Sequence, residues 1–256
     1  MLFASIIGIS QFINTWSHLY VPFTRAPQEP IVQVTHIPSA STSLMIDCHD
    51  IEHNKCIALT FDDGPYGTST SQILNILKKE QVLATFFLIG KNAELHSDQV
   101  RQEIALGEVI GNHSYSHSQV LSTMSSSTLR EDITHAQRII ENISGVSPHL
   151  FRPPYSRTSP AMVTEITREG YVFAGWNIDP RDWDNSNSST SIVTTVLTHA
   201  KPNSIVIFHD GHEYGTDYSR QNTIDALPQV ISLLKKQGYT FVTLDRILST
   251  NPYRSL

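Results

Sequence analysis

Short runs of β-branched and aromatic residues alternate with longer amphipathic segments from residue 56 onward. The apolar runs predict seven strands, at 56–61, 83–89, 109–111, 149–152, 171–176, 204–208 and 239–243. The amphipathic segments predict helices at 69–80, 93–106, 126–142, 160–168, 190–200 and 221–237, the last with one apolar stripe and a stop at Gly238. This alternation is typical of βα units around a parallel sheet, so it predicts an α/β fold.

Polar side chains with catalytic or metal-binding potential stand where several of these strands end. In a parallel α/β barrel the carboxyl ends of the strands form the catalytic face, so residues that are far apart in the sequence meet there. We therefore expect one site that collects the following side chains: Asp62, Asp63, His113, Arg152, Asp179 and His209.

The chain has 256 residues, 39% of them hydrophobic, which is enough to bury the core of one large domain. We expect this domain at 45–250, an N-terminal arm at 1–44 and a C-terminal tail at 251–256. The arm opens with an apolar run at 1–9 that is as long as a signal-peptide core but lacks a basic flank. A signal or anchor segment and a loosely packed arm are therefore both open interpretations.

The net charge is −6 and no run of Lys or Arg is present, so the chain lacks the footprint of a nucleic-acid or anionic-lipid binder. We expect no nucleic-acid partner and no need for a membrane partner. A neutral or mildly charged substrate fits this balance better.

The two cysteines, Cys48 and Cys56, could form a disulfide that closes a small loop before the first strand. Two unpaired thiols, with Cys56 packing as a small apolar residue, are an equal alternative, because spacing alone does not establish bridging geometry. The pair does not by itself decide the compartment.

Asp62 and Asp63 end the first strand, and His113 and His117 lie four residues apart later in the chain. Two histidines and one carboxylate are ligand types of a catalytic zinc with an open coordination position, and the second carboxylate would stay free as a base. Plainer interpretations are a strand entering an Asp-Gly-Pro turn and a surface loop with two solvated histidines. If a helical turn starts at His113, the i, i+4 spacing places both rings on one side.

Three further segments admit both a structural and a functional interpretation. Phe-Arg-Pro-Pro-Tyr at 151–155 is a rigid connector, and it could hold Arg152 against a carboxylate and aim a backbone N–H at developing negative charge. Asp-Pro-Arg-Asp-Trp at 179–183 is a turn with a surface Trp, or the lining of a sugar-binding cleft. The buried strand at 204–208 delivers His209, which taken alone would more often be structural.

Together these segments closely resemble the five motifs of the polysaccharide deacetylase family, also called the NodB-homology domain or carbohydrate esterase family 4. The matching segments are Thr-Phe-Asp-Asp-Gly-Pro at 60–65, His-Ser-Tyr-Ser-His at 113–117, Arg-Pro-Pro-Tyr at 152–155, Asp-Pro-Arg-Asp-Trp at 179–183 and Ile-Phe-His-Asp at 207–210. The resemblance covers residues 50–248. It implies a distorted (β/α)7-type barrel as a single catalytic domain.

The resemblance also implies the chemistry of the site. Zn²⁺, or another divalent metal such as Co²⁺ or Mn²⁺, would bind Asp63, His113 and His117. Asp62 would be the general base. The remaining implied roles are an acid (His209), its orienting partner (Asp179), a residue that fixes the base (Arg152), substrate-binding residues (Tyr155, Trp183 and Pro154) and a support for Arg152 or for the loop (Asp182). Ser156 departs from the family, which most often has Gly there.

The implied activity is N-deacetylation of N-acetylglucosamine-type glycans, such as chitin, chitooligosaccharide or peptidoglycan, with release of acetate. The first alternative is an O-acetyl esterase acting on xylan with the same machinery. The second is a non-catalytic carbohydrate-binding barrel, against which the presence of both a base and an acid argues. Because such polymers lie outside the cytoplasm, we expect an extracytoplasmic location, with a cytoplasmic one left open.

Overall fold

The computed structural model describes Cys48, residues 55–213 and residues 220–255. The predicted N-terminal arm at 1–44, with its signal or anchor segment, lies outside the described residues. Within the described part of the chain, no helix combines the length and the hydropathy needed to cross a membrane.

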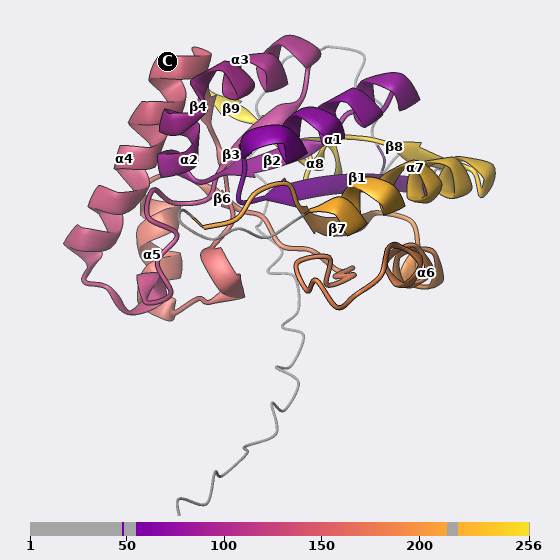
Figure 1. Ribbon diagram of the computed structural model, residues 1–256. Coiled ribbons are helices and arrows are strands. Elements are labelled where there is room, and N and C mark those ends of the chain that lie inside the picture. The colour runs from indigo at the N-terminus through magenta and orange to yellow at the C-terminus, as the bar shows by residue number, and fades with distance from the viewer. Residues whose placement is uncertain (1–47, 49–54, 214–219, 256) are drawn as a thin grey trace, which may run out of the picture. The chain divides into compact units, whose positions relative to one another are not determined.

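A seven-stranded parallel sheet forms the centre of the fold, in the order β6-β5-β3-β2-β1-β7, with β8 beside β1 (Figure 1). All seven predicted strands are present. Their bounds are β1 Lys55–Asp62, β2 Thr85–Leu88, β3 Val109–Asn112, β5 Leu150–Phe151, β6 Val172–Phe173, β7 Ser204–His209 and β8 Tyr239–Phe241. In β1 every residue after Lys55 is buried, as expected of a parallel strand that is covered on both faces.

The sheet curls into a distorted, incompletely closed barrel, which confirms the predicted fold class. Strand β1 has two partners along one edge, because its first three residues pair with β8 and its last three with β2. Strand β7 pairs with β1 along the other edge. In the described chain between β6 and β7, the barrel is closed without a further strand: Asn177 and Ile178, which follow β6, bond to the backbone of β7, and Ile178 forms an isolated bridge with Val206. The parallel pairing of β1 with β7 places Asp62 and His209 in register at the carboxyl ends of these strands.

The helices surround the sheet in an order that follows the strands, with α5, α4, α3, α1, α7 and α6 packed as successive neighbours (Figure 1). Their bounds are α1 Gly67–Glu80, α2 Gly90–Leu95, α3 Ser97–Leu106, α4 Ser126–Ser144, α5 Pro160–Arg168, α6 Ser189–His199, α7 Gln221–Lys236 and α8 Leu244–Ile247, with short 3-10 turns η1 Leu121–Thr123 and η2 Pro154–Ser156. The predicted helix at 93–106 is broken at His96, whose φ of −122° and ψ of 44° are not helical. Serine side chains cap the starts of α4, α5 and α6, as this residue type does well.

The core lies between the sheet and the helices. Three phenylalanines of adjacent strands stack at its centre: Phe61 lies 5.0 Å from Phe86 and 5.6 Å from Phe208, measured between ring centroids. In α7 the buried residues include Leu227, Ile231 and Leu234, which belong to the predicted apolar stripe. The strands are thereby fixed from one side of the barrel, and their carboxyl ends become a rigid support for loops.

The segment 251–256, predicted as a tail, is instead part of the folded domain as far as it is described. Its strand β9, Tyr253–Arg254, pairs antiparallel with β4, Ser147–Pro148. Arg254 also donates a hydrogen bond from Nη1 to the carbonyl of Glu169 at 2.8 Å. The domain therefore extends through Arg254.

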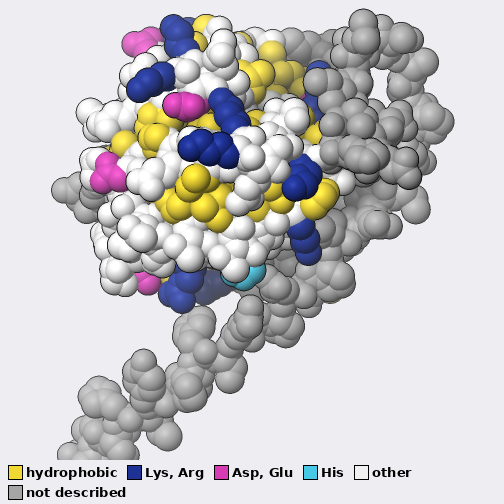
Figure 2. Space-filling view, turned by 90° about the vertical axis from the view of Figure 1, so that its right-hand side faces the viewer, with side chains coloured by type: hydrophobic (Ala, Val, Ile, Leu, Met, Phe, Trp, Pro, Cys, Tyr) yellow, Lys and Arg dark blue, Asp and Glu magenta, His cyan; other side chains and the backbone are white. Residues whose placement is uncertain are grey.

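Surface charge is dispersed on the face shown in Figure 2, where Lys and Arg side chains stand among hydrophobic and uncharged ones. The positions of two pairs of lysines are explained by the helices that carry them. Lys78 and Lys79 lie in the last turn of α1, and Lys235 and Lys236 lie in the last turn of α7. Cations at these positions interact favourably with the negative ends of the helix dipoles.

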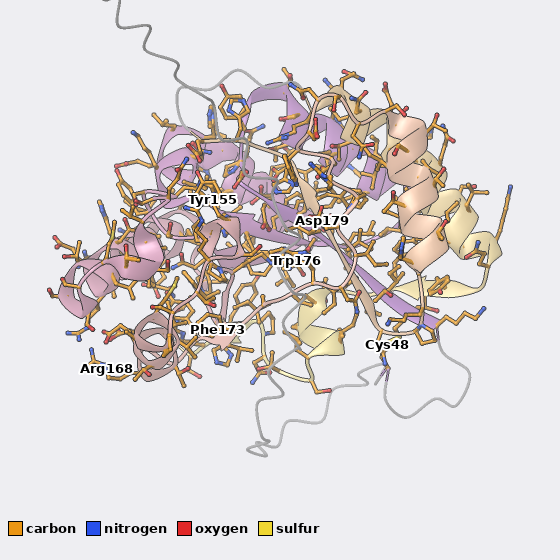
Figure 3. All side chains as sticks on the ribbon, turned by 90° about the horizontal axis from the view of Figure 1, so that it is seen from below. Cys48, Tyr155, Arg168, Phe173, Trp176 and Asp179 are labelled. Atoms are coloured by element: carbon orange, nitrogen blue, oxygen red, sulfur yellow. A yellow bond between two sulfur atoms is a disulfide. The ribbon has the colours of Figure 1, made fainter. Side chains whose placement is uncertain are left out.

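Cys48 and Cys56 form a disulfide, which decides between the two alternatives that the sequence leaves open. Cys56 is the second residue of β1, and Asp62 is its last, so the bond lies at the end of the strand away from the carboxylates. In Figure 3, Cys48 is likewise well separated from Tyr155 and Asp179. The disulfide therefore attaches the segment before the barrel to β1 without taking part in the polar cluster.

Removing this bond is expected to lower stability and leave the site intact. The two cysteines are 8 positions apart in the sequence. In the chain-entropy model, a bond that closes a loop this short raises the free energy of the unfolded state by about 2–3 kcal/mol. Cys48→Ser should therefore lower the free energy of unfolding by about that amount, as measured by urea denaturation. Wild-type protein in a reductant is the control and should approach the variant. A variant as stable as the oxidised wild type would contradict this role.

Candidate active site

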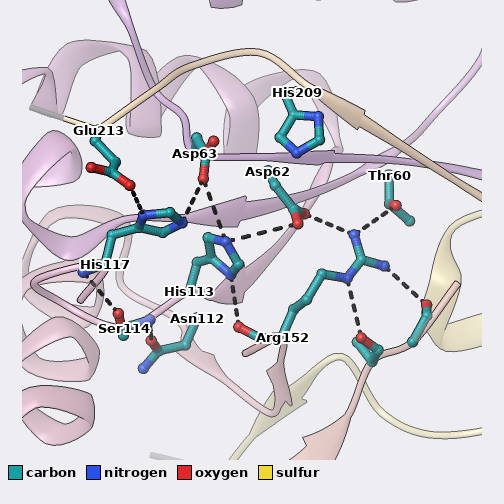
Figure 4. Close-up of polar contacts among 12 residues, drawn as sticks. Thr60, Asp62, Asp63, Asn112, His113, Ser114, His117, Arg152, His209 and Glu213 are labelled. Atoms are coloured by element: carbon teal, nitrogen blue, oxygen red, sulfur yellow. Dashed lines mark hydrogen bonds and ion pairs between the residues drawn. The ribbon is translucent and has the colours of Figure 1, made fainter. Parts of the chain in front are cut away.

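Asp63, His113 and His117 form a buried cluster that is suited to a metal ion (Figure 4). The Oδ1 atom of Asp63 lies 3.4 Å from Nε2 of His113 and 3.1 Å from Nε2 of His117. The other ring nitrogens are engaged elsewhere: Nδ1 of His113 lies 2.7 Å from the carbonyl of Arg152, and Nδ1 of His117 lies 3.3 Å from Oε1 of Glu213. Both Nε2 atoms are thus presented to one point, and two histidines with one carboxylate fit a divalent metal such as zinc.

The charge state of Asp63 suits metal binding. Burial alone would raise the pKa of Asp63, but hydrogen bonds from His113 and His117 hold that pKa well below its ordinary value. Asp63 therefore stays a carboxylate despite its burial, as a metal ligand must.

A loop, and not the helical turn considered from the sequence, brings the two histidines together. Ser114 and His117 adopt positive φ angles of 67° and 50°, which turn the backbone twice within five residues. The Ser114 amide donates to Oδ1 of Asn112 at 2.8 Å, and the His117 amide donates to Oγ of Ser114 at 3.1 Å. These side-chain bonds hold the left-handed conformations that a non-glycine residue adopts only at some cost.

Asp62 is held apart from the candidate metal ligands by Arg152, as predicted. Nη1 of Arg152 donates to Oδ1 of Asp62 at 2.7 Å, and the other oxygen of Asp62 lies 3.8 Å from Nε2 of His113. Asp63 has a φ of 74°, so the adjacent carboxylates point to different partners. One oxygen of Asp62 is thus anchored, and the other faces the cluster.

Arg152 is fully buried and its donors are well satisfied. Besides Asp62 it donates to Oγ1 of Thr60 at 2.8 Å and to the carbonyls of Ala174 and Gly175, each at 3.1 Å. Its guanidinium also lies 4.1 Å from the centroid of the Phe87 ring. Burial lowers its pKa, while the charge of Asp62 opposes that change. A planar, multiply bonded guanidinium of this kind gives Asp62 one orientation.

The carboxylate that contacts His209 is Asp182, and not Asp179 as predicted. Oδ1 of Asp182 lies 2.8 Å from Nδ1 of His209, and its Oδ2 accepts from the His209 amide at 2.8 Å and from Oγ1 of Thr223 at 2.7 Å. Burial alone would lower the pKa of His209, but Asp182, with Asp63 and Asp62, raises it to about 9. His209 is therefore held as a cation near neutral pH. Of the two roles predicted for Asp182, support of Arg152 or of the loop, the first is contradicted, since none of the Arg152 hydrogen bonds found among the described residues goes to it.

Asp179 has a different structural role, within its own turn. Its Oδ1 accepts a hydrogen bond from the Arg181 amide at 2.7 Å, and Arg181 has a positive φ of 54°. Burial raises the pKa of Asp179, while the nearby charge of His209 acts in the opposite direction. Asp179 thus shapes the loop that carries Asp182 and lies within electrostatic reach of His209.

The predicted substrate-binding residues lie around the cluster. The Tyr155 ring packs against the His117 ring with centroids 4.6 Å apart, and its backbone has a φ of 56°. Ser156, where the family most often has Gly, also adopts a positive φ, of 58°. Pro154, the first residue of this turn, is buried, whereas Trp183 is 44% exposed, with the Arg181 guanidinium over its ring. Tyr155 and Trp183 therefore offer accessible aromatic surface on two separate loops of the site.

Several residues that contact the site were not found from the sequence. Thr60 and Thr223 were missed because a hydroxyl within a buried element carries no catalytic signal of its own. The others lie outside the five segments: Asn112 and Glu213 lie close to one, whereas Asn92 and Arg220 are far from all of them in the sequence and carried no signal. The missed residues are Thr60, Asn92, Asn112, Glu213, Arg220 and Thr223.

Comparison with known proteins identifies the family. A family model described as Polysaccharide deacetylase matches residues 49–174. A peptidoglycan-N-acetylglucosamine deacetylase of Bacillus cereus is 39% identical over 198 residues, which cover 77% of this chain and 89% of the relative. The chain belongs to the polysaccharide deacetylase family. The protein is accordingly a hydrolase, as its residues and their resemblance to the family predict.

A longer relative and a solved structure also resemble this chain over the same domain. A bifunctional xylanase/deacetylase of Pseudobutyrivibrio xylanivorans is 38% identical over 197 residues, but the match spans only 31% of that protein. The crystal structure of a peptidoglycan N-acetylglucosamine deacetylase, bound to a naphthalenyl N-oxidanyl-benzamide, has a TM-score of 0.73 and 34% identity. It covers 78% of this chain and 91% of its own. These likenesses establish the deacetylase domain in this chain.

Proposed function

We propose that the protein is a zinc-dependent N-deacetylase that removes acetyl groups from N-acetylglucosamine units of a glycan and releases acetate. One observation carries the proposal: Asp63, His113 and His117 converge on one point beside an anchored carboxylate, Asp62, and a cationic histidine, His209 (Figure 4). Peptidoglycan is the favoured polymer, because relatives with 35% and 39% identity carry that name. Chitin and chitooligosaccharide have the same acetamido group.

In the proposed reaction each side chain has a separate task. The metal would supply Lewis acidity, which polarises the acyl oxygen and makes a water molecule easier to deprotonate. Asp62 takes a proton from that water, and Arg152 keeps the carboxylate aimed through the 2.7 Å bond to its other oxygen. The attack on the carbonyl carbon then produces a negatively charged tetrahedral centre.

Tyr155 would stabilise the negative charge of this centre, and His209 would supply the proton for the leaving group. The backbone N–H of Tyr155, displayed by a left-handed turn, would donate to the developing oxyanion, a contribution often worth about 3 kcal/mol. His209 gives its proton to the departing amine nitrogen as the C–N bond breaks. Asp182 holds the ring of His209 in place, so the proton is carried by the nitrogen that faces the site.

A second candidate activity is O-deacetylation of xylan by the same residues. The similarity to a bifunctional xylanase/deacetylase favours it, because that relative is as close in identity as the peptidoglycan enzymes. The chemistry differs mainly at the leaving group: an alkoxide leaves in place of an amine, and either accepts a proton from His209. The exposed ring of Trp183 would stack on a sugar of either polymer.

We also propose an extracytoplasmic location. The Cys48–Cys56 disulfide supports it, since such bonds persist in oxidising compartments and are rare in the cytosol. The proposed polymers lie in the same surroundings.

The test is acetate release from a panel consisting of peptidoglycan glycan, chitooligosaccharide and acetylated xylan, measured with zinc-loaded and chelator-stripped protein. We expect release from the N-acetylated glycans, loss of activity after stripping and recovery when Zn²⁺ is added. Release from xylan alone would select the esterase. Binding of the glycans without any release by fully metal-loaded protein would contradict both activities and indicate the carbohydrate-binding alternative.

A further inference from the structure

We propose that Glu213 is a positioning residue for the metal site: its carboxylate orients His117 and strengthens metal binding through that ring. This inference rests on the proposed metal-dependent function and adds a residue to it from outside the five segments of the family resemblance. The side chains of Glu213 and His117 are in direct contact (Figure 4).

The Glu213 carboxylate occupies the face of His117 that points away from the cluster. Its Oε1 atom lies 3.3 Å from Nδ1 of His117, while Nε2 of the same ring lies 3.1 Å from Oδ1 of Asp63. A carboxylate accepts but does not donate, so this contact favours the tautomer with the proton on Nδ1. When a metal is bound, Nε2, which lies beside Asp63, would carry no proton in this tautomer and would offer its lone pair to the ion, as a metal ligand must.

The two histidines differ in what holds them. Nδ1 of His113 faces a neutral backbone carbonyl, that of Arg152, at 2.7 Å, whereas Nδ1 of His117 faces a charged side chain. A carboxylate on the far nitrogen makes an imidazole a more basic ligand than a carbonyl does. His117 itself is nearly buried, with 7% of its side chain exposed, so its ring has few other ways to be oriented.

The connection between β7 and α7 places Glu213 by means of contacts with Asp63. A Cβ on Gly211 would stand 2.2 Å from the carbonyl oxygen of Asp63, so the two backbones meet where only glycine fits. Nδ2 of Asn92 donates both to that oxygen, at 2.8 Å, and to the carbonyl of His212, at 3.0 Å. Glu213 follows His212 directly. Its position is therefore set by the same residues that fix the backbone of a metal ligand.

The other end of this connection also contacts Asp63. Arg220, which is buried, donates from Nε to the carbonyl of Gly211 at 2.7 Å, and its Nη2 lies 4.0 Å from Oδ2 of Asp63. The oxygen of Asp63 that does not face the histidines thus has a cation beside it. The described residues between β7 and α7, at 210–213 and 220, consequently support two of the three candidate metal ligands, and Glu213 is the exposed, replaceable part of that support.

The experiment compares Zn²⁺ affinity among full-length variants by competition with a chromophoric chelator. Glu213→Ala removes the acceptor, and Glu213→Gln keeps a neutral acceptor without the charge. Glu94→Ala is the matched control, because Glu94 is another exposed carboxylate and its partner, the Tyr115 hydroxyl, belongs to the loop that carries both histidines. Thermal melting of the metal-free proteins reports whether the fold itself has changed.

We expect the zinc dissociation constant to rise about 10- to 100-fold in Glu213→Ala, to rise less in Glu213→Gln, and to stay unchanged in Glu94→Ala. Metal-free melting temperatures should be alike, since the Glu213 side chain is 40% exposed. Wild-type affinity in Glu213→Ala, or an equal loss in Glu94→Ala, would overturn the role of Glu213 but leave the proposed function standing. Failure of the wild-type protein to bind zinc would overturn both.

Discussion

Asp62→Asn should lower deacetylation by on the order of 10²- to 10⁴-fold while the protein keeps its full complement of zinc. The amide oxygen of asparagine can still accept the hydrogen bond that Arg152 now donates to Asp62 at 2.7 Å, so the local geometry has a reason to survive. What disappears is the basic oxygen that takes a proton from water. The rate of acetate release and the zinc content by elemental analysis, measured on the same sample, provide the test.

The neighbouring substitution Asp63→Asn is the matched control. Both carboxylates are buried, but only Asp63 lies within 3.4 Å of the two histidine Nε2 atoms. Asp63→Asn should therefore lose metal and, with it, activity. An Asp62→Asn protein that turns over near the wild-type rate would remove Asp62 from the role of base, and one that loses its zinc would remove the distinction between the two residues.

The barrel was predictable because its elements carry strong local signals. Each central strand is an apolar run that is buried on both faces, and α7 shows an apolar stripe at helical spacing. What escaped prediction depends on distant contacts. Strands β4 and β9 are two residues long and exist through pairing with each other, and the four-residue helix α8 is too short to show a period. The break at His96 is likewise a local backbone choice without a Gly or Pro to mark it.

The positions of the site residues were predictable for a topological reason, but their pairing was not. Parallel strands bring Asp62 and His209 to one edge whatever the loops do. Which aspartate contacts His209 depends on the loop at 179–183. There the Asp179 carboxylate accepts a hydrogen bond from the Arg181 amide, and the positive φ of Arg181 changes the direction of the backbone. Asp182 then meets the histidine. Two aspartates three residues apart cannot be ranked for such a contact without knowing that turn.

Asp182→Asn should move the alkaline limb of the kcat/KM profile to lower pH and reduce the rate at neutral pH by on the order of 10²-fold. Burial tends to lower the pKa of His209, and Asp182 is the main group that raises it, with Asp63 and Asp62, to about 9. Without the Asp182 charge that pKa falls, so His209 loses its proton at a lower pH and can no longer protonate the departing amine there. Acetate release measured across a pH series gives the profile.

The pH dependence of the free energy of unfolding tests the interaction between Asp182 and His209 independently of activity. Because the folded-state pKa of His209 lies above its ordinary value of about 6.5, the stabilisation from its interaction with Asp182 is complete below that value and is lost as the pH rises through about 9. Asp182→Asn should therefore reduce the free energy of unfolding more at pH values below about 6.5 than at values above about 9. Equal losses at both ends would show that Asp182 acts through its bond to Thr223 and not through the charge of His209.

Asp179→Asn is the matched control, since it is the same chemical change three residues earlier. Oδ1 of Asp179 accepts from a backbone amide, and the hydrogen bonds of His209 in the described structure go to Asp182. Asp179 acts on His209 only through its charge at longer range, so the alkaline limb should shift less than in Asp182→Asn. A larger shift in Asp179→Asn would reverse the assignment, because the residue that sets the proton affinity of His209 must be the one whose neutralisation moves that limb most.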